Sequence, residues 1–261
     1  MQFFRLLATS IALMLLSQPA DSRPLELRDY LNWEQASNPQ VSPDGRRVLY
    51  TRTRVDKLAD RMDSEIWQMD ADGSRNRYLL KGSGARWSPS GDRIAFVAEA
   101  DGKAQLHVRW MDDEGSVTQI TWDTVTPTDF RWSPDGEWIA FRAEVPMKPA
   151  IEISLPERPP GAEWTEDPPV IDKLHYRVDQ VGLKTGYKHL FVVPASGGTP
   201  RQLTAGNWDV GRHFFGIDAE GASSMSWTRD GTGIVFSAVM DEDDETGGYA
   251  SSFHAVDVAT G

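Results

Sequence analysis

The chain has 261 residues, of which 39% are hydrophobic and 10% are aromatic, so it is long and apolar enough to bury a sizeable core. Its formal net charge of −12 argues against a nucleic-acid partner, because phosphate binding needs clustered Lys and Arg. It contains no cysteine, which excludes disulfides, thiolate chemistry and Cys-ligated zinc.

Residues 1–22 have the pattern of a secretory signal peptide. One positive charge at Arg5 precedes the apolar run 6–16, and the small residues Ala20 and Ser22 suit a cleavage site. The run is shorter than the ~20 residues that span a bilayer, so we expect no membrane anchor in the mature chain. Export without cysteine is typical of the bacterial periplasm, and we expect an exported protein, periplasmic or secreted.

Residues 23–37 are predicted to form a short lead-in helix. Leu27, Tyr30 and Leu31 recur at helical spacing, and the segment leads directly into Asn38 and Pro39. This short lead-in leaves no room for a separate amino-terminal domain between the signal peptide and the first repeat.

A short motif centred on a glycine occurs four times and organises the rest of the chain. The third copy, 131–141, reads RWSPDGEWIAF, and the glycines of the four copies are spaced by 46, 45 and 95 residues. The four glycines are Gly45, Gly91, Gly136 and Gly231. A period of about 40 to 50 residues is typical of β-propeller blades.

Each copy has the local chemistry of a β-hairpin. Pro presets the backbone of a type I turn, Asp or Ser bonds its own backbone, and Gly adopts the positive φ that closes the reversal. The motif is followed by apolar residues that alternate with others, as in Ile94 and Phe96, which is the period of a strand. A large apolar residue precedes the turn, and we interpret Trp87, Trp132 and Trp227 as packing between blades.

A second predicted hairpin follows the motif, which gives four strands per unit. Its strands are 65–70 with 77–80, 105–110 with 118–121, and 189–193 with 201–204. The predicted fold is therefore all-β: residues 38–261 form a partial β-propeller of about four blades of four antiparallel strands with WD40-like repeats. The sequence ends inside the last blade, after the third strand 252–258, and we expect the chain to be the front part of a longer protein.

Two excursions interrupt the blades. Residues 52–63 are rich in charge and are predicted to form a solvated loop. Residues 147–186 form an insertion in blade three, whose many prolines exclude regular helix or central strand. The insertion is also too apolar for a free linker, so we expect it to be ordered and packed on one face of the propeller.

Catalytic and metal-binding motifs are nearly absent. The chain has no G-x-S-x-G, no H-E-x-x-H and no phosphate-binding loop. The five histidines show no ligand spacing, and His107 and His189 fall in predicted third strands. Residues 70–73 weakly resemble a calcium loop but fit a turn between strands, and the acidic run 241–245 is typical of a solvated loop. We therefore predict no catalytic residue, no metal and no cofactor in this chain.

Several of these motifs together resemble the amino-terminal propeller of the prolyl oligopeptidase (S9) family. The resemblance rests on the lead-in 27–31, on the repeated W-S-P-x-G turns, and on the hairpin 189–204. It covers essentially the whole mature chain, and it is greatest to the exported dipeptidyl aminopeptidase and acylaminoacyl peptidase type. In that family the propeller caps an α/β-hydrolase domain that carries a Ser-Asp-His triad, for which this chain has no matching position.

The resemblance implies that this chain is the substrate-gating and size-filtering portion of a serine peptidase that acts on short peptides. As given, without a nucleophile, it is expected to be inactive. Some relatives bind the amino terminus of the substrate with propeller carboxylates, and Glu242 and Glu245 are our candidates for this substrate-binding role. The alternative is a non-enzymatic periplasmic interaction propeller like TolB, although such proteins place an α/β domain before the blades. A catalytic metal site in the central channel is disfavoured because no histidines converge.

Overall fold

The computed structural model describes most of the chain from Arg23 onward. The described residues are 23–122, 126–147, 155–165, 168, 170–171, 177–178, 182–211, 225–238 and 251–261. They divide into two compact units, one made of 23–34 with 54–63 and the other of 35–53 with 64–261. No helix in these described ranges is long and apolar enough to cross a membrane.

The smaller unit contains a single helical turn, α2 (Leu27–Tyr30). A capping box between Glu26 and Asp29 begins the turn, and Arg23 forms an ion pair with Asp29. The expected helix over 23–37 is thus much shorter than predicted, because strand β1 already begins at Glu34. Between the helical turn and this strand, the amides of residues 31–33 donate to carbonyls three residues earlier, as in tight turns.

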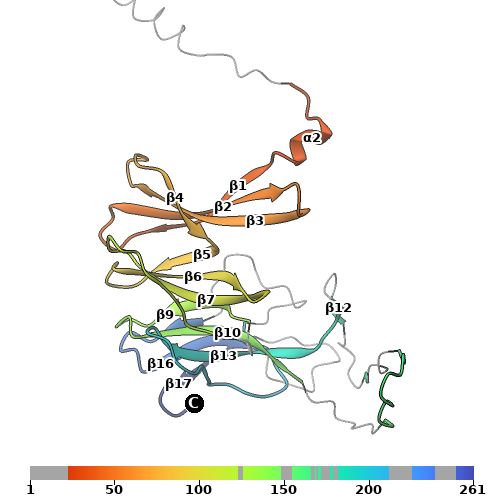
Figure 1. The fold of residues 1–261 in the computed structure, drawn as a ribbon. Helices are drawn as coiled ribbons and strands as arrows, with labels where there is room; N and C mark the ends of the chain where they lie inside the picture. Colours follow the sequence, from red (N-terminus) through yellow and green to blue (C-terminus); the bar gives the residue numbers. More distant parts are fainter. Residues whose placement is uncertain are drawn as a thin grey trace, which may run out of the picture. The chain divides into compact units, whose positions relative to one another are not determined.

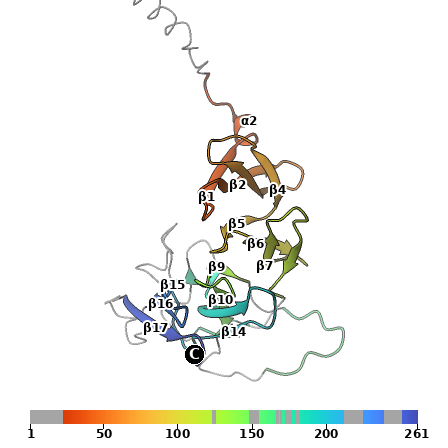
Figure 2. The same ribbon diagram turned by 90° about the vertical axis from the view of Figure 1, so that its left-hand side faces the viewer.

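Antiparallel sheets follow one another along the chain (Figures 1 and 2). Residues 34 and 54–63 of the first sheet belong to the smaller unit, and the other strand residues belong to the larger unit. Blade one has the order β1 (Glu34–Val41), β2 (Arg47–Asp56), β3 (Arg61–Asp70) and β4 (Arg77–Lys81). Blade two has the order β5 (Ser83–Trp87), β6 (Arg93–Ala100), β7 (Lys103–Trp110) and β8 (Val117–Gln119). Each strand pairs with its sequence neighbour, as the predicted hairpins require.

Blades three and four complete the described framework. Blade three has the order β9 (Thr128–Trp132), β10 (Trp138–Pro146), β13 (Gly186–Pro194) and β14 (Arg201–Gln202). Blade four has three described strands, β15 (Met225–Trp227), β16 (Gly233–Ala238) and β17 (Ser252–Asp257). Strand β15 contacts β9, and Figure 2 shows β15, β16 and β17 beside β9 and β10. The all-β fold of three four-stranded blades and one three-stranded blade confirms the predicted partial propeller.

The blade-three insertion lies outside the four-stranded sheet, as predicted. Pro146 pairs with Gly186, so the excursion runs from 147 to 185 and leaves the sheet order of the blade intact. Its described part contains a separate two-stranded sheet of β11 (Arg177–Val178) and β12 (Gly182–Leu183). The excursion therefore leaves the blade at the end of β10 that is remote from the turn at Gly136.

The prediction of a solvated loop over 52–63 was wrong. Strand β2 continues to Asp56 and β3 begins at Arg61, so only a tight turn of four residues remains between them. Thr51, Thr53 and Val55 alternate with charged residues along β2, which is the period of a strand with one polar face. The charged residues of this segment correctly indicate a solvent-facing surface, but they do not indicate a loop.

The fourth strands of blades two and three are shorter than predicted, because threonine side chains replace part of the ladder. The hydroxyl of Thr121 accepts a hydrogen bond from the backbone N–H of Leu106 at 2.9 Å, and Thr204 accepts one from Leu190 at 2.9 Å. The two threonines hold equivalent places in the repeat. Their side chains satisfy buried amides that a longer strand would have paired.

The core is divided among the interfaces between consecutive blades. Alternate residues of the second strand face the preceding and the following blade, so blades two and three each contribute to two clusters, and blades one and four to one each. The largest cluster lies between blades two and three and includes Leu106, Phe130, Ile139 and Phe141. Phe141 stacks on Phe191, which lies directly opposite on β13, with ring centroids 5.5 Å apart.

Candidate functional site at the inner strands of the blades

The carboxylates proposed for substrate binding, Glu242 and Glu245, lie outside the described residues, as do His175 and His213. Two of the other histidines are satisfied within their strands, as predicted. His189 is 2% exposed and contacts the hydroxyl of Thr204 and the carbonyl of Gly206. His107 contacts the carbonyl of Gln105. Burial lowers the pKa of both imidazoles, which favours their neutral forms at neutral pH.

The segment that weakly resembles a calcium loop also has a structural role, whereas the acidic run 241–245 lies outside the described residues. Residues 70–73 form the turn between β3 and β4, in which the Gly73 amide donates to the Asp70 carbonyl at 2.9 Å. Within the described ranges, no group of three or more His, Asp or Glu side chains is gathered as a metal ion would require.

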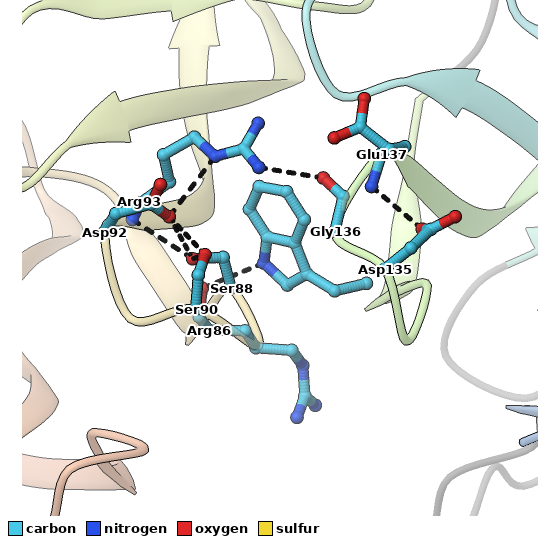
Figure 3. A network of polar contacts seen from close by, with 9 residues as sticks. Arg86, Ser88, Ser90, Asp92, Arg93, Asp135, Gly136 and Glu137 are labelled. Atoms are coloured by element: carbon cyan, nitrogen blue, oxygen red, sulfur yellow. Dashed lines mark hydrogen bonds and ion pairs between the residues drawn. The ribbon is translucent and has the colours of Figure 1, made fainter.

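The repeated Ser-Pro-Asp-Gly turn is a closed hydrogen-bond network. In blade three the hydroxyl of Ser133 donates to the Asp135 carboxylate and accepts from the Trp138 amide at 2.9 Å. Asp135 also accepts from the amide of Glu137 at 3.0 Å (Figure 3). Ser42 with Asp44 and Thr228 with Asp230 repeat this arrangement in blades one and four. The Ser133 hydroxyl, followed by the Glu137 amide, lowers the pKa of Asp135.

Consecutive inner strands are joined by the tryptophan that precedes each turn. The indole N–H of each tryptophan donates to a backbone carbonyl of the preceding blade. The acceptor is the residue that precedes the aligned position of that blade's own copy of the motif. Trp87 donates to Gln40 at 3.2 Å, Trp132 to Arg86 at 3.1 Å, and Trp227 to Arg131 at 3.2 Å. The same indole to carbonyl hydrogen bond, between equivalent repeat positions, thus occurs at three interfaces. We call this repeated contact, together with the turn packing described next, the seam.

The turns themselves also pack from blade to blade. A Cβ atom added at Gly91 would lie 3.2 Å from the ring of Pro43, and one at Gly136 would lie 3.5 Å from Pro89. At the first two seams an arginine covers the indole ring: Arg47 lies 4.8 Å from the ring centre of Trp87, and Arg93 lies 5.2 Å from that of Trp132. Figure 3 shows Arg93 reaching the carbonyl of Gly136 in the next blade, at 3.0 Å.

A cluster of arginines lies on these inner strands and on the strand next to one of them. Arg86 and Arg131 occupy the same repeat position, immediately before the tryptophan, and Arg142 lies on β10. The carboxylate of Asp129 is 2.6 Å from Arg131 and 3.8 Å from Arg142. Arg142 also donates to the carbonyl of Val210 at 3.0 Å and is 5% exposed. Asp129 has a φ of +40°, an unfavourable backbone conformation for a residue other than glycine.

Arg86 has the most perturbed environment of this group. Burial lowers the pKa of its guanidinium, the charge of Arg131 lowers it further, and Asp129 opposes these effects. Its guanidinium lies over the ring of Phe130, 5.8 Å from the centroid. The arrangement can therefore attract an anion, because a half-buried cation with a like-charged neighbour gains most from an opposite charge.

A cavity of about 400 Å³ opens beside the inner strands β9 and β15 and extends onto the outer face of blade four. Arg131 and Trp132 line one side of it, and Ser226, Val235 and Phe253 belong to its blade-four wall. Its lining is mostly apolar with a guanidinium at one edge, a combination found in small-molecule sites. Sequence reasoning missed both the arginine cluster and this cavity. The available signal was the repetition of arginine before tryptophan in the second and third copies.

Comparison with known proteins supports the expected relationship. The model of the dipeptidyl peptidase IV (DPP IV) N-terminal region matches residues 163–241. The uncharacterized peptidase YuxL of Bacillus subtilis (strain 168) is 29% identical over 219 residues, which are 80% of this chain and 30% of the relative. The chain thus spans about a third of the length of that relative.

A solved peptidase structure shares the fold of this chain. An acylaminoacyl peptidase from Pyrococcus horikoshii matches with a TM-score of 0.56 and 17% identity, over 80% of this chain and 28% of that one. TolB from Acinetobacter baumannii matches with a TM-score of 0.45 and 19% identity, over 79% of this chain and 38% of that one. The family match and the peptidase relative thus show similarity to amino-terminal regions of prolyl oligopeptidase (S9) family peptidases, and the solved peptidase shares the propeller fold.

Proposed function

We propose that this propeller is the gate and size filter of an exported S9 serine peptidase that acts on short peptides. The supporting relatives carry peptidase names, and this chain spans 30% of one and 28% of another, so the nucleophile would reside in a hydrolase domain elsewhere in the protein. Such a gate admits short substrates, excludes folded proteins and limits water at the acyl-transfer site.

The observation that carries the proposal is the seam. A size filter must keep a fixed opening, and an opening between blades widens if the blades separate. Here each described interface is held by an indole N–H to carbonyl bond of 3.1 to 3.2 Å and by packing of a turn glycine against the preceding blade. The repeated hydrogen bonds and packing contacts favour blades that stay in fixed positions around the opening.

The blade-three insertion supplies the surface that we propose meets the hydrolase domain. It leaves the blade at the end of β10 remote from the Ser-Pro-Asp-Gly turn. Among its described residues, Leu155, Trp164 and Ile171 are large apolar side chains that are exposed. Apolar anchors of this kind commonly dominate an interface. In this scheme Glu242 and Glu245 bind the amino group of the substrate, and residues 1–22 direct export.

The test compares the complete reading frame that contains this chain with the 261-residue chain alone. We expect the complete protein to cleave aminoacyl and dipeptidyl chromogenic substrates, with kcat/KM falling steeply as peptides lengthen, and the chain alone to have no activity. Determining the amino terminus of the exported protein checks cleavage near residue 22. Replacing Glu242 or Glu245 with Gln should raise KM for substrates with a free amino terminus and leave acetylated substrates unchanged.

Two outcomes would contradict the proposal. One is turnover by the rigorously purified 261-residue chain, which would require a nucleophile that the sequence does not provide. The other is a reading frame without a G-x-S-x-G motif followed by Asp and His, which would favour a non-enzymatic interaction propeller.

A further inference from the structure

We propose that Arg86 is the anchor of a carboxylate-binding subsite on the inner strands of blades two and three, which recognises the carboxyl terminus of a short peptide. The inference rests on the proposed function and names a feature of the substrate that the filter reads. Its structural basis is the position, the charge balance and the direction of this side chain.

The position of Arg86 gives its side chain room beside a rigid wall. In the register of blade two, Arg86 lies opposite Ala95, and Arg131 lies opposite Ala140 in blade three. Both alanines are completely buried and small, so a long side chain can extend past them. The carbonyl of Arg86 accepts the Trp132 indole, which fixes the backbone that carries the guanidinium. A side chain on a fixed backbone is a better anchor than one on a mobile loop.

Arg86 has no ion pair among the described residues. The carboxylate of Asp129, which opposes the effect of burial on Arg86, pairs with Arg131 and Arg142. A cation removed from water without a counter-charge is unfavourable, so the cluster would be stabilised by an anionic ligand.

Arg86 is the member of the cluster that is available to a ligand. In the described structure its guanidinium contacts the ring of Phe130 and has no hydrogen bond. Figure 3 shows it pointing away from Ser88, Ser90 and Asp92, whose contacts hold the neighbouring turn. A planar guanidinium with five free donors matches a carboxylate, with which it can form two parallel hydrogen bonds.

Binding of the carboxyl terminus of a peptide would explain chemically how the protein selects substrates by size. Only a short peptide can place its carboxyl terminus at a fixed distance from an active site that binds its other end. The cavity beside Arg131 adds an apolar volume of about 400 Å³ on the adjoining strand, which can accept a side chain. Recognition of both ends would add a selection for length to the selection made by the opening.

The test measures peptide binding to the 261-residue chain by isothermal titration calorimetry. The probes are acetyl-Ala-Ala-Ala with a free carboxyl terminus, its carboxyl-terminal amide, acetyl-Asp-Ala-Ala-amide, and acetate alone. We expect the free-acid peptide to bind most tightly. Arg86→Gln should weaken it about tenfold or more, the worth of a charge-assisted hydrogen bond, and leave the amide unchanged. Arg86→Lys, which keeps the charge and loses the planar fork, should give an intermediate loss.

Arg77→Gln is the matched control, since it removes the same charge from an exposed position on β4. Thermal unfolding of each variant separates loss of binding from loss of fold. Three results would overturn the inference: equal affinity for the free acid and the amide, an Arg86→Gln variant that binds the free acid like wild type, or binding of acetate or the aspartyl amide as tight as that of the free acid.

This test is independent of the test of the proposed function, because it needs no cleavage. If length selectivity is found in the complete protein without carboxylate binding, only the subsite is wrong. If carboxylate binding is found and the reading frame encodes no hydrolase domain, the peptidase function is wrong.

Discussion

Blade three packs on blade four, whereas no described sheet covers the outer face of blade four. Side chains at the same repeat positions are buried on the first of these faces and exposed on the second. Leu190 in β13 is 0% exposed, as are its equivalents Leu106 and Ile66, whereas Phe253 at the same position of β17 is 85% exposed. On the second strand, Ala140 is 0% exposed and Val235, its equivalent, is 37% exposed. The repeat therefore places an apolar residue at each position, and a neighbouring sheet decides whether that residue is buried.

A polar position shows the same contrast. In blade one, Thr51 accepts a hydrogen bond from the amide of Gly84 in the next blade, and in blade three the equivalent Arg142 donates to the carbonyl of Val210. Ser237 is the equivalent in blade four, and its buried hydroxyl has no hydrogen-bond partner in the structure. The contribution of a seam to stability can be measured by matched substitutions on the two faces.

The largest expected difference between the two faces comes from truncating one equivalent pair. Leu190→Ala should lower the free energy of unfolding by about 3 kcal/mol, because it leaves a cavity in a packed seam. Phe253→Ala should change it by less than about 0.5 kcal/mol, since the ring is mostly in solvent. Urea denaturation of both variants measures the difference. Similar losses would mean that Phe253 is buried in solution.

The second comparison uses two turn glycines with the same backbone conformation. Gly91 has a φ of +74° and packs on Pro43, whereas Gly45 has a φ of +72° and no atom within 4 Å of an added Cβ. Gly45→Ala should cost about 1 kcal/mol from backbone strain alone. Gly91→Ala should cost about 2 kcal/mol, because the methyl group also presses on the preceding blade. Equal losses by calorimetry would show that the turns do not contact one another.

The third comparison isolates the polar part of the seam. Trp132→Phe removes the indole N–H that binds the Arg86 carbonyl and keeps most of the aromatic contact, so it should cost about 1 kcal/mol. Trp138→Phe is the control, because this tryptophan is more exposed and lies on β10 beside the seam. A loss of stability confined to Trp132→Phe would support a contribution of this hydrogen bond to the seam. Equally small losses in both variants would mean that the hydrogen bond does not stabilise the fold.

The parts of this fold that could be predicted from sequence are those set by local chemistry. The Ser-Pro-Asp-Gly turns form because Ser, Asp and Gly satisfy one another within five residues, as at Ser133 and Asp135, so their letters alone specify the hairpin. The strand period after each turn followed directly. The strand over 52–56 was missed because its alternating charges were taken as evidence for a loop.

The candidate site could not be predicted because it depends on what lies across a seam. Arg86 and Arg47 are both arginines near a turn, yet one lies over Phe130 and the other over Trp87. Residues about 40 positions away decide which arginine forms an ion pair and which remains available to a ligand. Asp129, which pairs with Arg131, is an example. Sequence repetition identifies equivalent positions, but it does not show the partner that each position meets.

The smallest expected effect is a pH dependence that the two faces should share, because it arises within the turns. The hydroxyl of Ser133 and the Glu137 amide lower the pKa of Asp135, and a hydroxyl followed by an amide does the same for Asp44 and Asp230. A carboxyl whose pKa is lower in the folded state adds stability that is fully present above its unfolded pKa of about 3.9 and is lost as the pH falls through the folded value. Asp135→Asn keeps an acceptor oxygen but cannot ionise. The stability advantage of wild type over this variant should therefore be constant from pH 7 to 5 and shrink towards pH 3. Urea denaturation across this range measures it, with the exposed Glu114→Gln as a control for net charge. An advantage that persists unchanged at pH 3 would mean that the turn carboxylate contributes through its shape and not through its charge.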